Sequence, residues 1–216
     1  MEKRPLRIGI DIDDVLVQSA ARSIELYNLS FGTRLTLDDW YNFSDPDFYG
    51  PRWGTSDIPE IVKRVVATLK DDDFLTVETV DGAQAALLYL NEQGHKLFAI
   101  TGRSEGIRAQ TKALLDKNFS NIFTDETLFF VDHFEHDGKK VSKADIGLQL
   151  NLTHFVEDLP AHANAMAYVG IKTVLLNTGG YGWSTIGLDS AVSAYIIQLD
   201  SWKHTTEYFD AETARQ

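Results

Sequence analysis

From Asp81 onward, short apolar runs alternate with segments of helical spacing, and this alternation constrains the fold more than any other feature of the chain. The runs that predict strands are residues 96–100, 128–131, 154–156, 173–176 and 195–199. The segments that predict helices between them are residues 82–92, 107–116, 144–150 and 161–169. Because the strand segments are apolar throughout, both faces of the sheet should be covered. The pattern predicts an α/β fold with a doubly wound parallel sheet.

A further apolar run, residues 7–10, predicts the first strand, but the chain does not then continue with the regular alternation. Residues 19–31 and 58–70 have helical spacing. Residues 32–56 are dense in aromatic residues, Pro and Gly, which predicts an irregular segment. We therefore predict a core domain made of residues 1–17 and 81–216, with a small helical cap inserted at residues 18–80.

Composition excludes several classes of function. The 216 residues include no cysteine, so disulfides, thiolate metal sites and a cysteine nucleophile are excluded. The formal net charge of −12 disfavours binding to a nucleic acid duplex, and a phosphate site would need a metal ion or local cations. The N-terminal residues lack the apolar stretch of a signal peptide, and no apolar run approaches the roughly 20 residues that cross a bilayer. These features predict a cytoplasmic protein.

An acidic cluster, Asp11-Ile12-Asp13-Asp14, follows the first predicted strand directly. Two carboxylates at positions i and i+2 can point into one loop cavity, where one attacks phosphorus and the other handles the proton of the leaving group. Taken alone, the cluster fits equally well with a solvated loop or the start of a helix.

Three more polar signals follow later strands. Thr101-Gly102-Arg103 offers a hydroxyl and backbone N–H groups that could hold a phosphate oxygen. Lys143, the best candidate among Lys139, Lys140 and Lys143, could neutralise phosphate charge. Glu157-Asp158 offers the oxygen ligands that Mg²⁺ prefers. Each has a plain structural alternative, respectively a turn, a solvated lysine and a helix cap. Because ligands bind at the carboxyl ends of strands in such sheets, all four signals should converge on one phosphoryl-transfer site.

This order of motifs resembles the haloacid-dehalogenase-like hydrolase superfamily, over residues 7 to 160. Within it, the chain resembles the 5′(3′)-deoxyribonucleotidase-like family. The segments that carry the closer resemblance are Trp53-Gly54, Asp81-Gly82-Ala83, Ile100-Thr101-Gly102-Arg103, Ser142-Lys143-Ala144-Asp145 and Val156-Glu157-Asp158. Asp14 departs from the glycine that is common at its position in the superfamily.

The resemblance implies a Mg²⁺-dependent phosphomonoester hydrolase that forms an aspartyl-phosphate intermediate. Asp11 would be the nucleophile and a metal ligand, and Asp13 the general acid and base, with its backbone carbonyl on the metal. The residues that would bind the phosphoryl group are Thr101, Gly102 and Lys143.

The resemblance also implies that Asp158 completes the Mg²⁺ shell, with Glu157 bound directly or through water. The expected substrate is a (deoxy)nucleoside monophosphate. The inserted segment matches the small helical cap of such enzymes, and its aromatic residues could stack on a base. Trp53 is the first choice for that role and Phe43 the second, whereas the alternative is that these rings form the core of the cap itself.

Three other functions stay open on the sequence. A phosphatase of the same class could act on a sugar phosphate or another small metabolite. A non-catalytic phospho-acceptor module would also use acidic residues, a Thr and a Lys, but its acceptor lies on a later strand. A binding protein that retained only the fold is disfavoured by the full set of expected side chains, which are Asp11, Asp13, Thr101, Lys143 and Asp158.

Overall fold

The computed structural model describes residues 4–41, 50–119, 122–131, 141–180, 184 and 186–215. The chain forms two compact units, one made of Met1–Leu16 with Thr79–Gln216 and the other of Val17–Glu78. We call them the sheet unit and the helical unit. Among the described residues, no helix has the length and apolar character needed to span a membrane.

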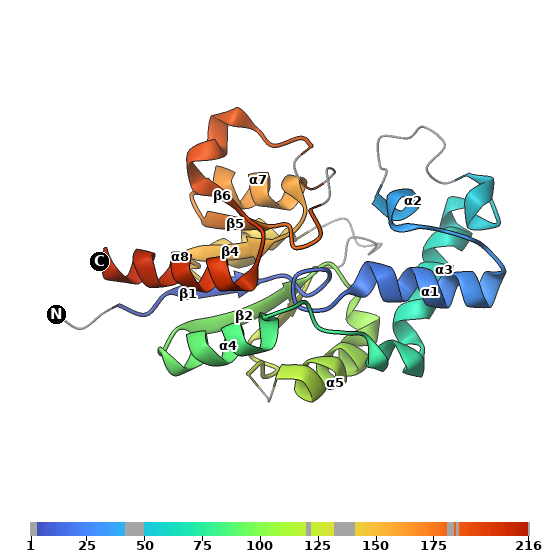
Figure 1. Cartoon of the computed structure of the whole chain (residues 1–216), viewed down its shortest axis with the longest axis horizontal. Coiled ribbons are helices and arrows are strands. Elements are labelled where there is room, and N and C mark those ends of the chain that lie inside the picture. The colour runs from blue at the N-terminus through green and yellow to red at the C-terminus, as the bar shows by residue number, and fades with distance from the viewer. Residues whose placement is uncertain are drawn as a thin grey trace. The chain divides into compact units, whose positions relative to one another are not determined.

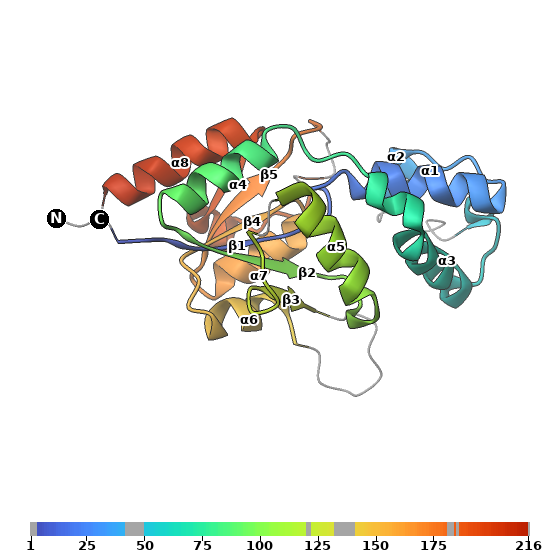
Figure 2. The ribbon, with the colours of Figure 1, turned by 90° about the horizontal axis from the view of Figure 1, so that it is seen from below.

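The sheet unit contains six parallel strands in the order β3-β2-β1-β4-β5-β6. Figure 1 labels β1, β2, β4, β5 and β6, and β3 is labelled in Figure 2. Their bounds are β1 Arg7–Ile10, β2 Lys96–Thr101, β3 Leu128–Phe130, β4 His154–Glu157, β5 Lys172–Leu176 and β6 Ile196–Leu199. The order reverses beside β1, since the chain builds outward first on one side of β1 and then on the other. The predicted doubly wound parallel sheet is confirmed.

Helices cover both faces of this sheet. Figure 2 shows α4 (Ala83–Glu92) and α8 (Trp202–Ala214) on one side and α6 (Lys143–Gln149) and α7 (Pro160–Tyr168) on the other. Helix α5 (Arg108–Phe119) packs against α4. Short 3₁₀ turns, η3 and η5, occupy Glu105–Ile107 and Ser190–Tyr195. Right-handed crossovers between parallel strands require this placement of helices on both faces.

Close packing between the central strands depends on Gly9 in β1. A Cβ atom at this position would lie 2.5 Å from side-chain atoms of both Leu152 and Phe155. Phe155 in β4 is fully buried and belongs to a cluster of apolar side chains with Ile100 and Met166. Gly9 therefore allows the large Phe155 ring to fill the space beside β1, which any side chain would obstruct.

The helical unit consists of α1 (Ser19–Phe31), α2 (Leu37–Tyr41), η1 (Pro51–Trp53), α3 (Ile58–Lys70) and η2 (Asp72–Thr76). The two long helices have the bounds predicted from their spacing. The prediction of an irregular segment at residues 32–56 is wrong where α2 and η1 form. In α2, Asp38 and Asp39 lie in the first turn, where carboxylates interact favourably with the helix dipole.

A small apolar core holds the helical unit together. Its buried members are Ile24, Tyr27, Leu35, Trp53 and Ile61. The Tyr27 hydroxyl donates a hydrogen bond to the Trp53 carbonyl at 2.8 Å, and the two rings pack edge to face. Tyr27 thus satisfies its polar atom while its ring stays buried.

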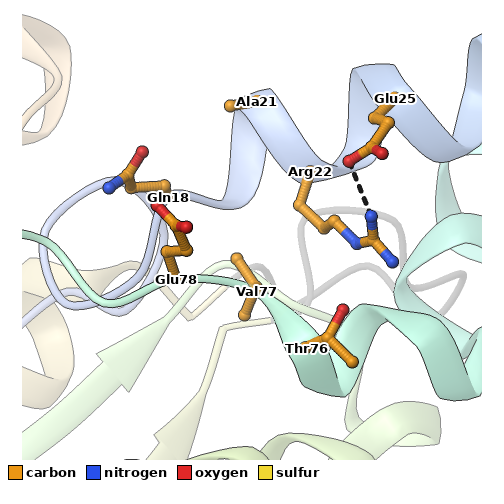
Figure 3. A pocket seen from close by; sticks show the side chains of 7 residues that line it. All are labelled: Gln18, Ala21, Arg22, Glu25, Thr76, Val77 and Glu78. Atoms are coloured by element: carbon orange, nitrogen blue, oxygen red, sulfur yellow. Dashed lines mark hydrogen bonds and ion pairs between the residues drawn. The ribbon is translucent and has the colours of Figure 1, made fainter.

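The helical unit also contains a cavity of about 240 Å³ (Figure 3). Its lining residues are Gln18, Ala21, Arg22, Glu25, Thr76, Val77 and Glu78. Arg22 pairs with Glu25 at 2.6 Å and donates to the Asp73 carbonyl, so its guanidinium is already engaged. None of the lining residues carries an aromatic ring, and this cavity therefore offers no stacking surface for a base.

Candidate active site

The register of the central strands places the predicted polar residues side by side. Ile10, the last residue of β1, pairs with Ala99 of β2 and with Val156 of β4. The next residue, Asp11, donates its backbone N–H to the Val156 carbonyl at 3.0 Å. Asp11 therefore leaves the sheet between the ends of β2 and β4, where Thr101 and Glu157 lie.

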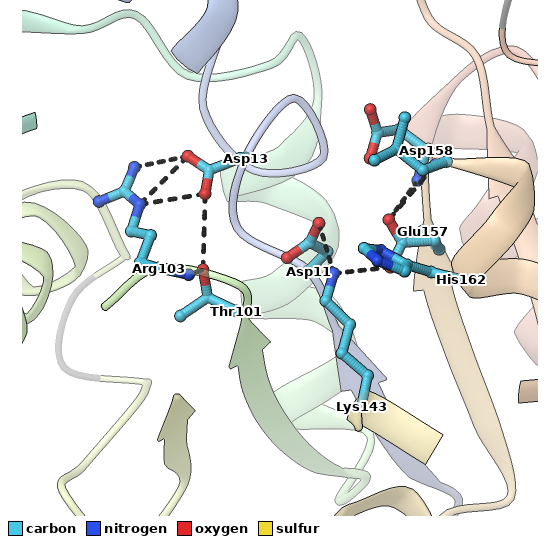
Figure 4. A network of polar contacts seen from close by, with 9 residues as sticks. Asp11, Asp13, Thr101, Arg103, Lys143, Glu157, Asp158 and His162 are labelled. Atoms are coloured by element: carbon cyan, nitrogen blue, oxygen red, sulfur yellow. Dashed lines mark hydrogen bonds and ion pairs between the residues drawn. The ribbon is translucent and has the colours of Figure 1, made fainter. Parts of the chain in front are cut away.

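Asp11 and Glu157 share one ammonium group. The Lys143 Nζ lies 2.8 Å from an Asp11 carboxylate oxygen and 2.8 Å from a Glu157 carboxylate oxygen (Figure 4). All three side chains are almost completely buried. Buried charges are stable only when they are paired and hydrogen-bonded, so this arrangement fixes the Lys143 side chain between the two carboxylates.

The local sequence around Lys143 explains its position. Ser142 caps α6 by accepting a hydrogen bond from the Asp145 backbone N–H, and the Asp145 side chain accepts one in return from the Ser142 backbone. This capping box starts the helix at Lys143. The helix therefore projects the lysine from its first turn toward the end of β1.

Three buried carboxylates form a group that could hold a metal ion. Asp11, Glu157 and Asp158 each offer an oxygen, and these atoms all lie within 4.8 Å of one another. The second Asp11 oxygen, Oδ1, is buried and has no hydrogen-bond partner among the described residues. Asp158 does not cap α7, because the helix begins after Leu159 without a side-chain cap. The residues fit a hard divalent cation such as Mg²⁺.

The electrostatics of this group also favour a cation. Burial raises the pKa of Asp11 and that of Asp158 well above their usual range, and neighbouring carboxylates add to both shifts. Burial alone would raise the pKa of Glu157, but the Lys143 ammonium and the His162 ring lower it overall. Burial likewise opposes the charge of Lys143, yet Asp11 and Glu157 raise its pKa. One ammonium does not balance three carboxylates, and added positive charge would favour their ionised forms.

The Glu157 side chain is engaged at both oxygens. One oxygen accepts from Lys143 and lies 3.4 Å from His162 Nδ1. The other accepts from the backbone N–H groups of Asp158 and Leu159, each at 3.3 Å. Glu157 therefore orients Lys143 and the loop after β4, which is a role that its sequence position alone did not indicate.

Asp13 has a different cation partner from Asp11. The Arg103 guanidinium donates to both Asp13 carboxylate oxygens, and the shortest N···O distance is 2.7 Å (Figure 4). The Thr101 hydroxyl lies 3.5 Å from the same carboxylate and accepts from the Arg103 backbone N–H at 3.1 Å. Gly102 lies between them in the bend after β2. The Thr101-Gly102-Arg103 motif thus forms one polar unit with Asp13.

Arg103 and His162 are the contacts that sequence reasoning missed. Arg103 stands inside a motif that the sequence singled out, but its partner Asp13 is 90 positions away in the chain. His162 lies on α7, four residues after Asp158, and is partly exposed beside Glu157. No local spacing indicates His162, because its partner Glu157 ends β4 and α7 begins only at Pro160.

The backbone of the acidic loop contains one uncommon conformation. Asp14 has a φ of 56°, in the left-handed region that favours glycine. A glycine would adopt this conformation without strain, whereas the Cβ atom of Asp14 makes it less favourable.

Trp53 and Phe43 were the residues expected to stack on a base. Trp53 is only 2% exposed and packs in the core of the helical unit, with its ring 5.5 Å from that of Trp40. In this structure its ring has no open face for a base and forms part of the core of the helical unit, as in the alternative that the sequence left open. Phe43 lies outside the described residues, as do Lys139 and Lys140.

Comparison with solved structures identifies the fold. A haloacid-dehalogenase-like family hydrolase from Streptococcus pneumoniae superposes with a TM-score of 0.65 at 14% identity, over 95% of this chain and 98% of that one. The chain has the haloacid-dehalogenase-like fold. A structure described as a putative β-phosphoglucomutase from Thermotoga maritima gives a TM-score of 0.62 at 16% identity, over 95% and 99% of the two chains. The expected resemblance to this superfamily is confirmed at the level of the fold.

Two sequence relatives share more identity with the chain than these solved structures do, and both are described as putative nucleotidases. A protein called "Putative nucleotidase" from Oceanobacillus iheyensis is 22% identical over 170 residues, which cover 79% of this chain and 86% of the relative. A second protein of that name, from Bacillus cereus, is 26% identical over 158 residues, covering 72% and 78%. No model of a protein family matches the chain.

Proposed function

We propose that the protein is a phosphomonoester hydrolase in which Asp11 is the nucleophile. The observation that carries this proposal is the position of the Asp11 carboxylate. It is buried at the end of β1, held by Lys143 at 2.8 Å, and keeps one oxygen without a hydrogen-bond partner among the described residues. A positioned carboxylate beside a cation is suited to attack phosphorus, whose negative oxygens the ammonium stabilises.

The reaction has two steps. In the first, the Asp11 carboxylate attacks phosphorus in line, and the bond from phosphorus to the ester oxygen breaks while Asp13 donates a proton to that oxygen. In the second, water attacks the aspartyl phosphate, its proton passes to Asp13, and inorganic phosphate leaves. Thr101, Gly102 and Lys143 would hold the phosphoryl oxygens during both steps.

The acidic group at this site is proposed to bind Mg²⁺. Asp11 and Asp158 would supply carboxylate oxygens, and the Asp13 backbone carbonyl a further ligand. Glu157 would act through water, since its own oxygens already bind Lys143 and the backbone. When bound, the ion would neutralise phosphate charge and help to orient the substrate for in-line attack.

The substrate is proposed to be a (deoxy)nucleoside monophosphate. Support comes from the two relatives named as nucleotidases and from the motifs shared with the deoxyribonucleotidase-like family. A sugar phosphate is the second candidate, because the structural neighbours include one described as a β-phosphoglucomutase. The cytoplasmic location expected from the sequence stays a prediction.

One experiment tests the reaction and the substrate class together. Phosphate release is measured across nucleoside monophosphates and sugar phosphates, with Mg²⁺ and with a chelator, for the wild type and for Asp11→Asn. We expect nucleotides to give the highest kcat/KM, and the chelator or the Asn substitution to abolish turnover. Substantial activity in Asp11→Asn would refute the mechanism, whereas a preference for sugar phosphates over every nucleotide would refute only the substrate.

Trp53→Ala should affect the fold of the helical unit and not base recognition specifically. Its ring fills the core of that unit, and removing a large buried aromatic side chain typically costs about 3–5 kcal/mol. Parallel changes in kcat/KM for a nucleotide and for p-nitrophenyl phosphate are therefore expected. A loss confined to the nucleotide would restore Trp53 as a base-stacking residue.

A further inference from the structure

Arg103 makes the most extensive polar contact in the site that the proposed reaction leaves unexplained. Its Nε lies 3.1 Å from each Asp13 carboxylate oxygen, and its Nη2 lies 2.7 Å from Oδ1. These distances describe a forked contact in which a planar guanidinium faces a planar carboxylate. Such two-point contacts fix the orientation of a carboxylate, which a single hydrogen bond does not.

The guanidinium is itself held firmly. The Arg103 side chain is 3% exposed, whereas that of Asp13 is 32% exposed. Its Nη1 donates to the Thr111 hydroxyl on α5 at 3.3 Å, and its backbone N–H donates to Thr101. Arg103 is therefore a buried support anchored on two elements, and Asp13 is the more accessible group that rests on it.

We propose that Arg103 is the positioning residue of Asp13, and that it sets the carboxylate orientation needed to accept a proton from the attacking water. This inference rests on the proposed phosphatase function. In the step concerned, the water oxygen bonds to phosphorus, the bond from phosphorus to the Asp11 oxygen breaks, and the water proton passes to Asp13. Phosphate and the free Asp11 carboxylate result.

The rates of the two half-reactions distinguish positioning of Asp13 from a role in binding the substrate phosphate or in maintaining the loop. With p-nitrophenyl phosphate, the leaving group departs without a proton, so the first step does not require Asp13 as an acid. Loss of orientation at Asp13 should then slow only the second step, and the aspartyl phosphate should accumulate. A residue that holds the substrate phosphate, or one that merely maintains the loop, would slow the first step as well.

The test uses Arg103→Gln and Arg103→Lys in rapid-quench experiments with p-nitrophenyl phosphate and Mg²⁺. Formation of p-nitrophenolate gives the first step, and covalent phosphate retained on the acid-quenched protein gives the intermediate. We expect hydrolysis of the intermediate to slow by about 10- to 100-fold, as misplacement of a catalytic group can cost about 10²-fold. The first step should change by less than about threefold, and the phosphorylated fraction should rise above that of the wild type.

Arg103→Lys retains the positive charge but not the two-point contact with Asp13. It should therefore also slow the second step more than the first, and it provides the test even if the Gln variant fails to fold. Arg108→Gln is the matched control. Arg108 is also paired through two nitrogens with a carboxylate, that of Glu105, but within the described part of the chain it contacts no residue of the proposed site. It should leave both steps unchanged. Equal slowing of both steps in Arg103→Lys, or no accumulation of the intermediate, would overturn the inference. The phosphatase function itself is tested separately by Asp11→Asn.

Discussion

Replacing Lys143 by Met tests whether the buried ammonium stabilises the folded protein by pairing with the buried carboxylates of Asp11 and Glu157. Met has a similar length and no charge, so the change removes the two 2.8 Å contacts to Asp11 and Glu157 with little change in volume. Breaking a buried ion pair by removing one partner costs about 3–5 kcal/mol. Because Lys143 serves two carboxylates that are almost fully buried, we expect a loss of about that size in the free energy of unfolding near pH 8.

The pH dependence gives the sign of this effect. Without the ammonium, the folded-state pKa of Glu157, which Lys143 helps to lower, should rise above its unfolded value, and that of Asp11, which burial already raises, should rise further. Carboxyl groups with raised folded pKa values bind more protons when folded, so their protonation favours the folded variant as pH falls. The loss caused by the substitution should therefore be largest near pH 8 and smaller near pH 5.

Urea unfolding in the presence of a chelator, at pH 8 and at pH 5, measures the difference. Lys112→Met is the matched control, since Lys112 pairs with Asp116 on α5 at 2.5 Å but is only partly buried. Its substitution should cost no more than about 1 kcal/mol at either pH. A Lys143→Met protein as stable as the wild type at pH 8, or one whose deficit grows toward pH 5, would refute the reasoning.

Two further predictions concern stability. Asp14→Gly should raise the free energy of unfolding by about 0.5–1 kcal/mol, because glycine adopts the φ of 56° without strain. Asp14→Asn retains the Cβ atom and should gain less. Urea titration in the presence of a chelator measures both variants. Burial lowers the pKa of His154 from 6.5 to about 4, with Glu212 opposing the shift only in part. As pH falls, the unfolded chain therefore binds this proton before the folded protein does. The free energy of unfolding is not reduced by this group above about pH 6.5, and it decreases by up to about 3 kcal/mol as pH falls from about 6.5 through about 4. His154→Phe should flatten the stability curve over that range, and an unchanged slope would contradict the explanation.

The sheet and the long helices were predictable because their signals are local. Apolar strand segments and helical spacing in α1 and α3 depend only on neighbouring residues. Helix α8 gave no such signal, since its buried positions include the polar Thr205 and Glu212 beside Trp202 and Phe209. Glu212 is buried because it pairs with Lys172 and Arg215. An ion pair formed in the tertiary structure cannot be detected from the hydrophobic periodicity of one segment.

The clustering of polar side chains at the strand ends was predictable, but the pairing of cations with carboxylates was not. Strand ends determine that Asp11, Thr101 and Glu157 meet, because β1 lies between β2 and β4. No local pattern determines which cation serves which carboxylate, since that depends on side-chain rotamers across the sheet. Trp53 illustrates the same limit, because an aromatic residue next to Pro and Gly can face a ligand or fill a core, and only packing decides between these roles.

The separate cation partners of Asp11 and Asp13 bear directly on how one loop can perform two kinds of chemistry. If both carboxylates shared a single cation, a change at either one would alter the charge environment of the other. Instead, Lys143 holds Asp11 from α6, and Arg103 holds Asp13 from the loop after β2. In the proposed mechanism, Lys143 together with a bound metal ion would favour the ionised form of Asp11, whose pKa burial otherwise raises. Asp13, which is more exposed and is held by Arg103, would exchange the proton. The two carboxylates would thus perform different steps although they are only two residues apart in the chain.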